Sequence, residues 1–250
     1  MLQMKQIEPL IEELLKKPKP LLVILGATAS GKTALSLEAA KKYNGEIISA
    51  DSRQMYKYMD ISTEKILQKD QHGIKHHMID FCEPDEIYTA GQYKRDATKI
   101  IDDLHKRQKL PILAGGTGLY IRSITQNFDI PKIGPQKDFR KKLESDSIAE
   151  LYGKLQKIDP QSAEKIHPNN RRYIIRALEI NKFSKGKKQD RKNGPVYSVL
   201  QIGIDWPRAI IYDRINARVD SQIQKGLLDE IQSLIEKGYS PDLPSMSAIG

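Results

Sequence analysis

Residues 26–33 read Gly-Ala-Thr-Ala-Ser-Gly-Lys-Thr, a complete G-x-x-x-x-G-K-[ST] phosphate-binding loop. The loop follows a short apolar run and precedes a helical pattern, so the local prediction is strand, loop, helix. Gly26 and Gly31 let backbone N–H groups turn toward phosphate oxygens, and the helix directs its positive end at the same anion. Lys32 adds a point charge, and the Thr33 hydroxyl can ligate Mg²⁺. The motif predicts a bound diphosphate or triphosphate, but kinases, GTPases, ATPases and some group transferases share it.

The pattern around the loop alternates between strands and helices. Strands are expected at 21–25, 46–50, 110–114 and 198–204, helices at 32–43, 90–108, 207–225 and 227–237, and a short segment at 77–81. This alternation predicts the α/β class, with a P-loop NTPase-like parallel-sheet core formed by 21–130 together with 201–250. Residues 1–20 are expected to form an N-terminal helical extension, to which we assign no function.

The alternation lapses between the two parts of this core. Short helices are expected at 137–145, 147–157, 160–166 and 169–183, followed by a basic, breaker-rich loop at 185–195. The predicted insertion, 131–200, holds 17 Lys and Arg against 8 Asp and Glu, and the rest of the chain holds 24 against 24. Because the whole surplus charge lies in one segment, a polyanionic partner is favoured, nucleic acid first. Charge alone leaves a solvated helical surface as an equal alternative.

Composition limits the location that we expect. No apolar run approaches the ~20 residues that a membrane span requires. Glu8, Glu12 and Glu13 fall where a signal peptide would be apolar. Cys82 is the only cysteine, so no intrachain disulfide is possible, and we expect it to be a small buried hydrophobic side chain. A cytoplasmic protein without a membrane partner is therefore expected.

A carboxylate follows the second predicted strand. Asp51 lies at the carboxyl end of that strand, which in a parallel sheet is the edge that carries the phosphate loop. It is the leading candidate for a general base, with Mg²⁺ orientation and turn capping as alternatives. The strand that usually supplies an acidic metal ligand in kinases and GTPases ends here in Ala114-Gly115-Gly116-Thr117, without an acid.

Six motifs occur in a distinctive order between about residues 21 and 250. They are Gly26–Thr33, Asp51-Ser-Arg-Gln54, His76-His-Met-Ile-Asp80, Gly115-Gly-Thr-Gly-Leu-Tyr120, His167-Pro-Asn169 with Arg176-Ala-Leu-Glu179, and Arg214-x-x-x-Arg218-Val-Asp220. Together they resemble the tRNA dimethylallyltransferase family, also called the tRNA isopentenyltransferase family. The resemblance implies transfer of a dimethylallyl group from dimethylallyl diphosphate to the exocyclic N6 amine of the adenosine 3′ of the anticodon.

The resemblance also implies roles for individual residues. Asp51 would accept the amine proton, Lys32 and Arg218 would stabilise the departing diphosphate, and Thr117 would lie near the reacting centre. Thr117 could instead satisfy a Gly-rich turn. The diphosphate, with Mg²⁺ on Thr33, would lie on Gly26, Ala27, Thr28, Ala29, Ser30, Gly31, Lys32 and Thr33.

The implied acceptor is a tRNA anticodon stem-loop. Its target adenine must leave the base stack to reach the buried chemistry. Ile174 and Ile175 fit packing positions of a helix better than RNA contacts. The implied RNA-binding residues are Asp51, Ser52, Arg53, Gln54, Thr117, Arg140, Arg172, Tyr173, Ile174, Ile175 and Arg176. We expect the protein to act as a monomer.

Other functions and some departures from the family pattern are kept open. An adenylate isopentenyltransferase acting on free AMP or ATP, a P-loop small-molecule kinase and a nucleotide-switched RNA-binding protein are the alternatives. Ser62-Thr63-Glu64-Lys65-Ile66 replaces a more usual Gly-Thr-Ala-Lys-Pro, and Gln222 replaces a common methionine. No chemistry is predicted at either position. The sequence ends at Gly250, where members of the family that it resembles continue with a basic segment that helps hold tRNA, so its full tRNA affinity is left open.

His76 and His77 are adjacent and would point to opposite faces of an extended chain, so we predict that they do not form a metal site. Trp206 precedes Pro207 at a helix start, and we predict that it packs in the core rather than stacking on a base.

Overall fold

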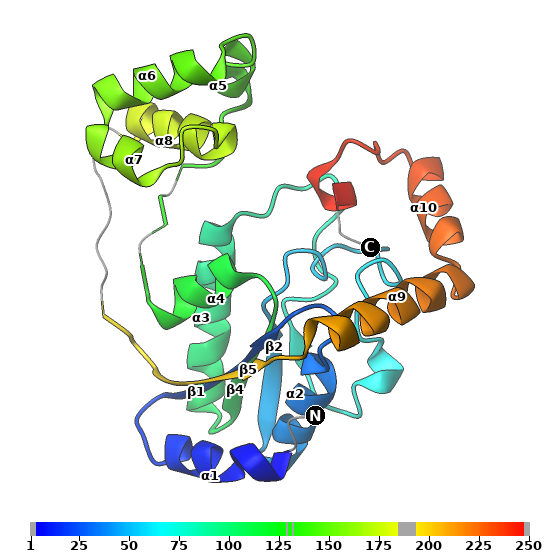
Figure 1. Cartoon of the computed structure of the whole chain (residues 1–250). Coiled ribbons are helices and arrows are strands. Elements are labelled where there is room, and N and C mark those ends of the chain that lie inside the picture. The colour runs from blue at the N-terminus through cyan, green and yellow to red at the C-terminus, as the bar shows by residue number, and fades with distance from the viewer. Residues whose placement is uncertain (1–3, 129, 132, 185–193, 248–250) are drawn as a thin grey trace. The chain divides into compact units, whose positions relative to one another are not determined.

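The computed structural model describes all residues except 1–3, 129, 132, 185–193 and 248–250 (Figure 1). The chain forms two compact units. The first comprises Met1–Asn127 and Asn193–Gly250, and the second comprises Phe128–Lys192. Each unit has its own apolar core, as the separate clusters of buried side chains show.

The first unit is built on a five-stranded parallel sheet with the strand order β3-β2-β4-β1-β5. The strands are β1 (Pro20–Gly26), β2 (Gly45–Ser49), β3 (His76–His77), β4 (Leu110–Gly115) and β5 (Ser198–Ile204). Leu22 of β1 is aligned with Ile112 on one side and Leu200 on the other, so β1 is a central strand. Its continuous apolar run fits a strand that is covered on both faces. The predicted α/β class is confirmed.

The helices of this unit are α1 (Met4–Leu15), α2 (Lys32–Lys42), α3 (Ala90–Lys106), α4 (Gly118–Thr125), α9 (Arg208–Gln224) and α10 (Leu227–Glu236), with short 3₁₀ turns η1 (Gln68–Asp70) and η2 (Pro244–Ser247). Helices α1 to α4 pack against this sheet, and α9 and α10 pack against each other. A capping box starts α3, because Thr89 and Gln92 exchange side-chain and backbone hydrogen bonds. Of the helices that the structure describes, none is long and apolar enough to cross a membrane.

Helix α1 corrects one prediction. It was expected to be an extension, but Ile7, Ile11 and Leu14 are buried. These side chains pack in the same apolar cluster as Leu22 of β1 and Ile112 of β4. The amphipathic pattern therefore places α1 within the core of the first unit, because its apolar face covers the sheet.

The second unit consists of α5 (Lys137–Lys142), α6 (Ile148–Ile158), α7 (Pro160–Lys165) and α8 (Arg171–Phe183), close to the four helices expected. Their core contains Leu151, Leu155, Ala163, Ile174 and Leu178. The boundary differs from the predicted 131–200, since residues 198–200 belong to β5 and are aligned with residues 20–22 of β1. Most of the predicted basic loop, residues 185–193, lies outside the described residues.

Candidate active site

The phosphate loop joins β1 to α2 through a backbone that favours small residues. Ala29 (φ 59°) and Gly31 (φ 100°) both adopt left-handed conformations. A Cβ at Gly26 would lie 2.7 Å from the Ile204 carbonyl oxygen and 2.8 Å from Ser30 Oγ. Glycine is therefore required at position 26 by close packing against β5, and at position 31 by the left-handed turn into the helix.

Lys32 lies at the start of α2, with its amine turned back over the loop. Its Nζ donates to the carbonyl oxygens of Gly26 (3.1 Å) and Ala27 (2.7 Å). Burial lowers the pKa of Lys32, the negative charge of Asp51 opposes this, and the positive charge of Arg218 adds to it. Asp51 and Arg218, from two other motifs, therefore both act on Lys32 through their charges.

Asp51 follows β2 at the edge that carries the phosphate loop. A Cβ at Gly115 would lie 2.2 Å from the Ala50 carbonyl oxygen, so glycine allows β4 to approach this turn closely. The Thr117 amide donates to the Ala50 carbonyl (3.0 Å), and the Ser52 amide donates to the Thr117 hydroxyl (3.0 Å). The Gly-rich segment after β4 thus fixes the backbone on both sides of Asp51.

A pocket of about 820 Å³ contains these groups. It brings together the phosphate loop, Asp51, Thr117 and Arg218, which the sequence predicted as one site. Asp51 Oδ1 accepts a hydrogen bond from the Arg53 amide (2.8 Å), so this oxygen is already partnered. The lining residues are Gly26–Ala34, Asp51–Gln54, Ser62–Glu64, Gly116, Thr117, Arg214, Ala217, Arg218 and Ser247.

Two further side chains, one after β5 and one in α9, support the phosphate loop. Trp206 Nε1 donates to the Ser30 carbonyl (2.9 Å), and Arg214 Nε donates to the Ala29 carbonyl (2.7 Å). The Arg214 guanidinium also lies 5.1 Å from the centre of the Trp206 ring. Trp206 packs against the core, as predicted, but its role in holding the loop was missed. For Arg214, the available signal was its spacing from Arg218, because residues four apart on a helix lie on the same face.

Comparisons with known proteins agree with this geometry. Residues 54–250 match a family model described as IPP transferase. The tRNA dimethylallyltransferase of Acetivibrio thermocellus is 46% identical over 238 residues, which cover 92% of this chain and 76% of that protein.

The chain belongs to the IPP transferase family. A tRNA dimethylallyltransferase from a Thermoanaerobacter species is 44% identical over 243 residues, covering 92% of this chain and 76% of that protein. The full-length tRNA isopentenylpyrophosphate transferase of Bacillus halodurans has a similar structure, with a TM-score of 0.67 at 40% identity, covering 93% of this chain and 75% of that one.

Not every RNA contact suggested by the family resemblance is free in this IPP transferase. The Arg53 guanidinium donates to the Pro244 carbonyl and to Ser247 Oγ (2.9 Å), so it holds the segment η2 against the pocket. Gln54 accepts from Ser49 Oγ (3.0 Å) and donates to the Thr63 carbonyl (3.4 Å). Both side chains line the pocket but are engaged by the chain itself.

The helical unit of this family member uses two of its predicted RNA-binding arginines internally. Arg140 donates to both oxygens of the fully buried Glu179 (2.9 and 2.8 Å), and Arg176 pairs with the same carboxylate. Burial raises the pKa of Glu179, but hydrogen bonds from Arg140, the Gln136 amide and Arg176 outweigh burial and bring it to about 2. This cluster holds together the segments before α5 and along α8.

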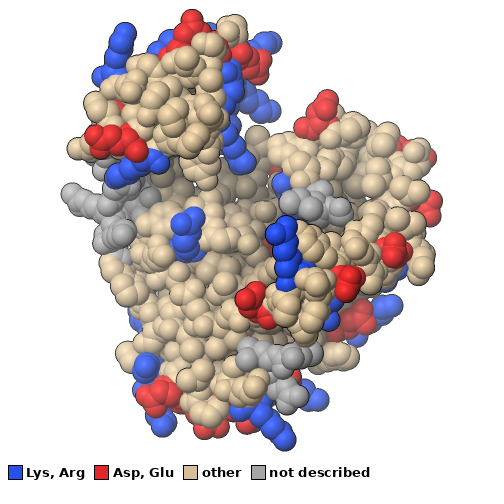
Figure 2. All heavy atoms as spheres, viewed as in Figure 1, with Lys and Arg blue, Asp and Glu red and all other residues tan. Residues whose placement is uncertain are grey.

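The other predicted residues on α8 divide by exposure. Ile174 is fully buried in the core of the helical unit, so it packs there and does not face RNA. Ile175 packs against the same core. Arg172 and Tyr173 are exposed, and Tyr173 keeps 62% of its surface accessible. On the face seen in Figure 2, several Lys and Arg side chains lie close together along one border of this unit.

The two adjacent histidines do not lie in a ligand cluster. His77 Nε2 lies 2.7 Å from the buried carboxylate of Glu46, which also binds Arg107 and Lys109. His76 Nδ1 lies 2.9 Å from the Ile74 carbonyl. Among the described residues, no group of three or more His, Cys, Asp or Glu side chains could hold a metal by itself.

A magnesium ion needs fewer protein ligands than such a cluster supplies. Mg²⁺ keeps several waters and is held by one or two protein groups together with substrate phosphates. The exposed Thr33 hydroxyl lines the phosphate pocket. The donor set of this pocket therefore fits an ion that arrives with a diphosphate.

Proposed function

We propose that this protein transfers a dimethylallyl group from dimethylallyl diphosphate to the exocyclic N6 amine of the adenosine 3′ of the anticodon in tRNA. The observation that carries the proposal is one pocket lined by the phosphate loop, Asp51, Thr117 and Arg218. Membership of the IPP transferase family supports it, because close relatives are named tRNA dimethylallyltransferases. We further propose that the protein acts as a monomer in the cytoplasm, where its tRNA acceptor is found.

The nucleophile is weak, so a base is needed. An exocyclic adenine amine attacks the allylic carbon, the bond from that carbon to the diphosphate oxygen breaks, and the amine loses a proton. Asp51 accepts this proton. Since Asp51 Oδ1 is held by the Arg53 amide, Oδ2 is the oxygen left for the proton. Thr117 acts through the backbone, because its hydroxyl accepts from the Ser52 amide and keeps Asp51 in place.

The departing diphosphate gains negative charge as the bond breaks. Backbone N–H groups of the phosphate loop, Lys32 and Arg218 stabilise that charge in a site already shaped for an anion. Arg214 keeps the loop in place through its bond to the Ala29 carbonyl. Thr33 would hold Mg²⁺, which would neutralise part of the diphosphate charge.

The acceptor requires base extrusion and an RNA-binding surface. The target base leaves the anticodon-loop stack to enter the pocket beside Asp51. Arg172 and Tyr173 are exposed on α8, and an arginine and an aromatic ring are suited to contact phosphate and an unstacked base. Together with the basic composition of the helical unit, they support tRNA rather than free AMP or ATP as the acceptor.

One experiment separates the proposed reaction from its alternatives. The protein is incubated with dimethylallyl diphosphate, Mg²⁺ and either an anticodon stem-loop or AMP, and the mass of each product is measured by mass spectrometry. The prenyl mass is expected on the stem-loop and not on AMP. Prenylated AMP would identify an adenylate isopentenyltransferase, and phosphate release from ATP without any prenyl transfer would indicate a kinase or NTPase.

A further inference from the structure

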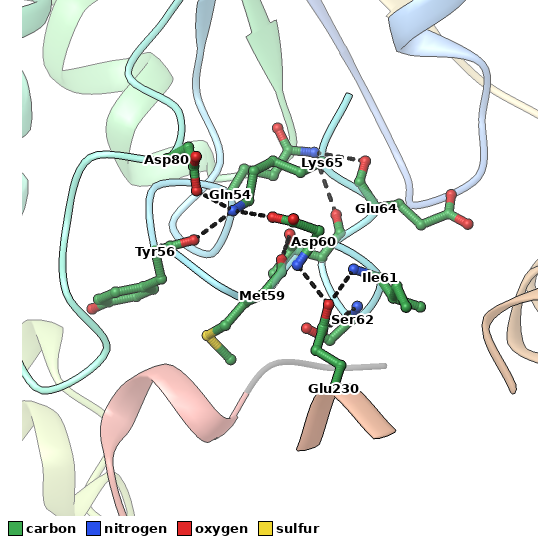
Figure 3. A network of polar contacts seen from close by, with 11 residues as sticks. Gln54, Tyr56, Met59, Asp60, Ile61, Ser62, Glu64, Lys65, Asp80 and Glu230 are labelled. Carbon is green, nitrogen blue, oxygen red and sulfur yellow. Dashed lines mark hydrogen bonds and ion pairs between the residues drawn. The ribbon is translucent and has the colours of Figure 1, made fainter. Parts of the chain in front are cut away.

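The loop after Met59 is hydrogen-bonded to a helix that lies far away in the sequence. Three consecutive backbone amides, those of Asp60, Ile61 and Ser62, donate to the carboxylate of Glu230 on α10 (2.8, 2.7 and 3.0 Å). Figure 3 shows the Glu230 side chain rising from the helix toward this turn. Hydrogen bonds to a carboxylate are stronger than those between neutral groups, and three of them converge here.

The opposite side of the same loop is held by a buried lysine. Lys65 is 7% exposed, and its Nζ lies 2.7 Å from Asp60 and 2.6 Å from Asp80. It also donates to the Tyr56 carbonyl (2.7 Å), as Figure 3 shows. Residues 60–65, which we call the clasp loop, are thus fixed to the sheet side of the unit by Lys65 and to α10 by Glu230.

Helix α9 is fastened to the same loop. Gln222 is 1% exposed, and its Nε2 donates to the carbonyls of Ile61 (2.8 Å) and Ser62 (3.2 Å). Helices α9 and α10 are joined by a short turn in which Gly226 has a φ of 94°. At Ile61 and Ser62 the clasp loop therefore donates its amides to one helix and accepts at its carbonyls from the other.

The far end of the clasp loop reaches the pocket. Ser62, Thr63 and Glu64 line it. The Glu64 carboxylate lies 3.6 Å from Arg218 Nε and 3.8 Å from Lys225 Nζ, both cations of the α9 segment. The Arg218 side chain is 18% exposed and lines the same pocket. A continuous set of contacts therefore leads from Glu230, through the clasp loop and Glu64, to Arg218.

We propose that Glu230 is a positioning residue for the reaction: by gripping the clasp loop it keeps α9, and with it Arg218, at the diphosphate side of the pocket. The inference rests on the proposed function, in which Arg218 stabilises the departing diphosphate. Glu230 touches no substrate. Removing its grip leaves Arg218 present but less well placed, and small misplacements of a charged group lower the rate strongly.

The first test replaces Glu230 by glutamine. The amide keeps one acceptor oxygen and turns an NH₂ toward the backbone amides, so the grip is lost with little change in volume. For Glu230→Gln, we expect the Kd for inorganic diphosphate with Mg²⁺, measured by calorimetry, to rise about tenfold, and kcat for stem-loop prenylation to fall by a similar factor. Glu236→Gln is the matched control, because Glu236 is an exposed acid on the same helix that accepts a hydrogen bond from Gln232.

The second test distinguishes positioning from general stability. If Glu230 acts through Arg218, Glu230→Gln will add little to the loss of diphosphate affinity already caused by Arg218→Ala. Effects that add in the double variant, or an unchanged affinity in Glu230→Gln, overturn the proposal. Should the glutamine variant fold poorly, Glu230→Asp keeps the charge one methylene shorter and is expected to lose about threefold in affinity, again only when Arg218 is present.

The two proposals fail in different ways. If the unmodified protein binds diphosphate but prenylates no RNA, the proposed function is wrong, while the calorimetric comparison still decides the role of Glu230. If the unmodified protein prenylates the stem-loop and Glu230→Gln does so with the same kcat and diphosphate Kd, the function stands and the positioning role is wrong.

Discussion

The two units of this protein use arginine in opposite ways. In the sheet-containing unit, Arg218 lies at the pocket and acts on Lys32 through its charge. In the helical unit, Arg140 and Arg176 are bound to the buried carboxylate of Glu179. Both sets belong to segments that resemble the same family. The difference teaches that a motif identifies the family, whereas burial and local partners decide whether a given cation is available to a substrate.

The largest expected effect is at the pocket. Asp51→Ala should slow prenyl transfer by ~10² or more, because the attacking amine loses its base. The Kd for inorganic diphosphate, measured by calorimetry, should change little. Asp51→Asn is the matched variant, since it keeps an acceptor for the Arg53 amide and still lacks the base. An equal loss of diphosphate binding in both variants would make Asp51 a metal or structural residue. The pocket would then no longer differ from the helical unit by containing a catalytic base.

The next effect is on the stability of the helical unit. Glu179→Gln should lower its free energy of unfolding by about 3 kcal/mol, because Arg140 and Arg176 lose a buried partner. Urea denaturation followed by circular dichroism measures the change. Glu164→Gln, at an exposed acid of α7, should leave it unaltered. Diphosphate binding should be retained by both variants, and its loss in Glu179→Gln would show that the units are not independent.

A smaller effect on the free energy of unfolding is expected when the pH is lowered. The pKa of Glu179 falls from an ordinary 4.5 to about 2 in the folded protein. A carboxyl group whose pKa is lowered on folding stabilises the fold above its unfolded pKa, and that contribution is lost as the pH falls toward the folded pKa. The difference in unfolding free energy between the unmodified protein and Glu179→Gln should therefore shrink between about pH 4.5 and about pH 2. A constant difference across that window would contradict the assignment.

The sequence predicted the sheet and the pocket well because their signals are local. The phosphate loop lies within eight consecutive residues, and Asp51 directly follows a buried strand. Parallel strands bring their carboxyl ends to one edge, so adjacency in space follows from the order of elements. Helix α4 was missed because it begins within a Gly-rich run, whose composition is typical of a loop.

The clasp loop could not be predicted, for the opposite reason. Glu230 grips an amide that lies 170 residues earlier, and its sequence context is that of an ordinary exposed helix. The departures at Ser62 and Gln222 were assigned no chemistry, yet Gln222 donates to the Ser62 carbonyl. The ion pairs of Arg140 and Arg176 were not predicted either, because nothing local marks Glu179 as buried. Long-range polar partners depend on packing that a single sequence does not display.

The smallest effect sharpens the comparison most, because it separates two arginines on one helix. Arg172 is exposed, so Arg172→Ala should leave the free energy of unfolding unchanged and weaken stem-loop binding about threefold to tenfold. The slope of the logarithm of the binding constant against the logarithm of the salt concentration should become shallower by about one. Fluorescence anisotropy at several salt concentrations measures both. Arg176→Met should instead lower the free energy of unfolding, because Glu179 loses an ion-pair partner, and should change stem-loop binding little. Lys99→Ala, at an exposed cation of α3, is the control. If Arg172→Ala and Lys99→Ala behave alike, RNA does not bind this face of α8.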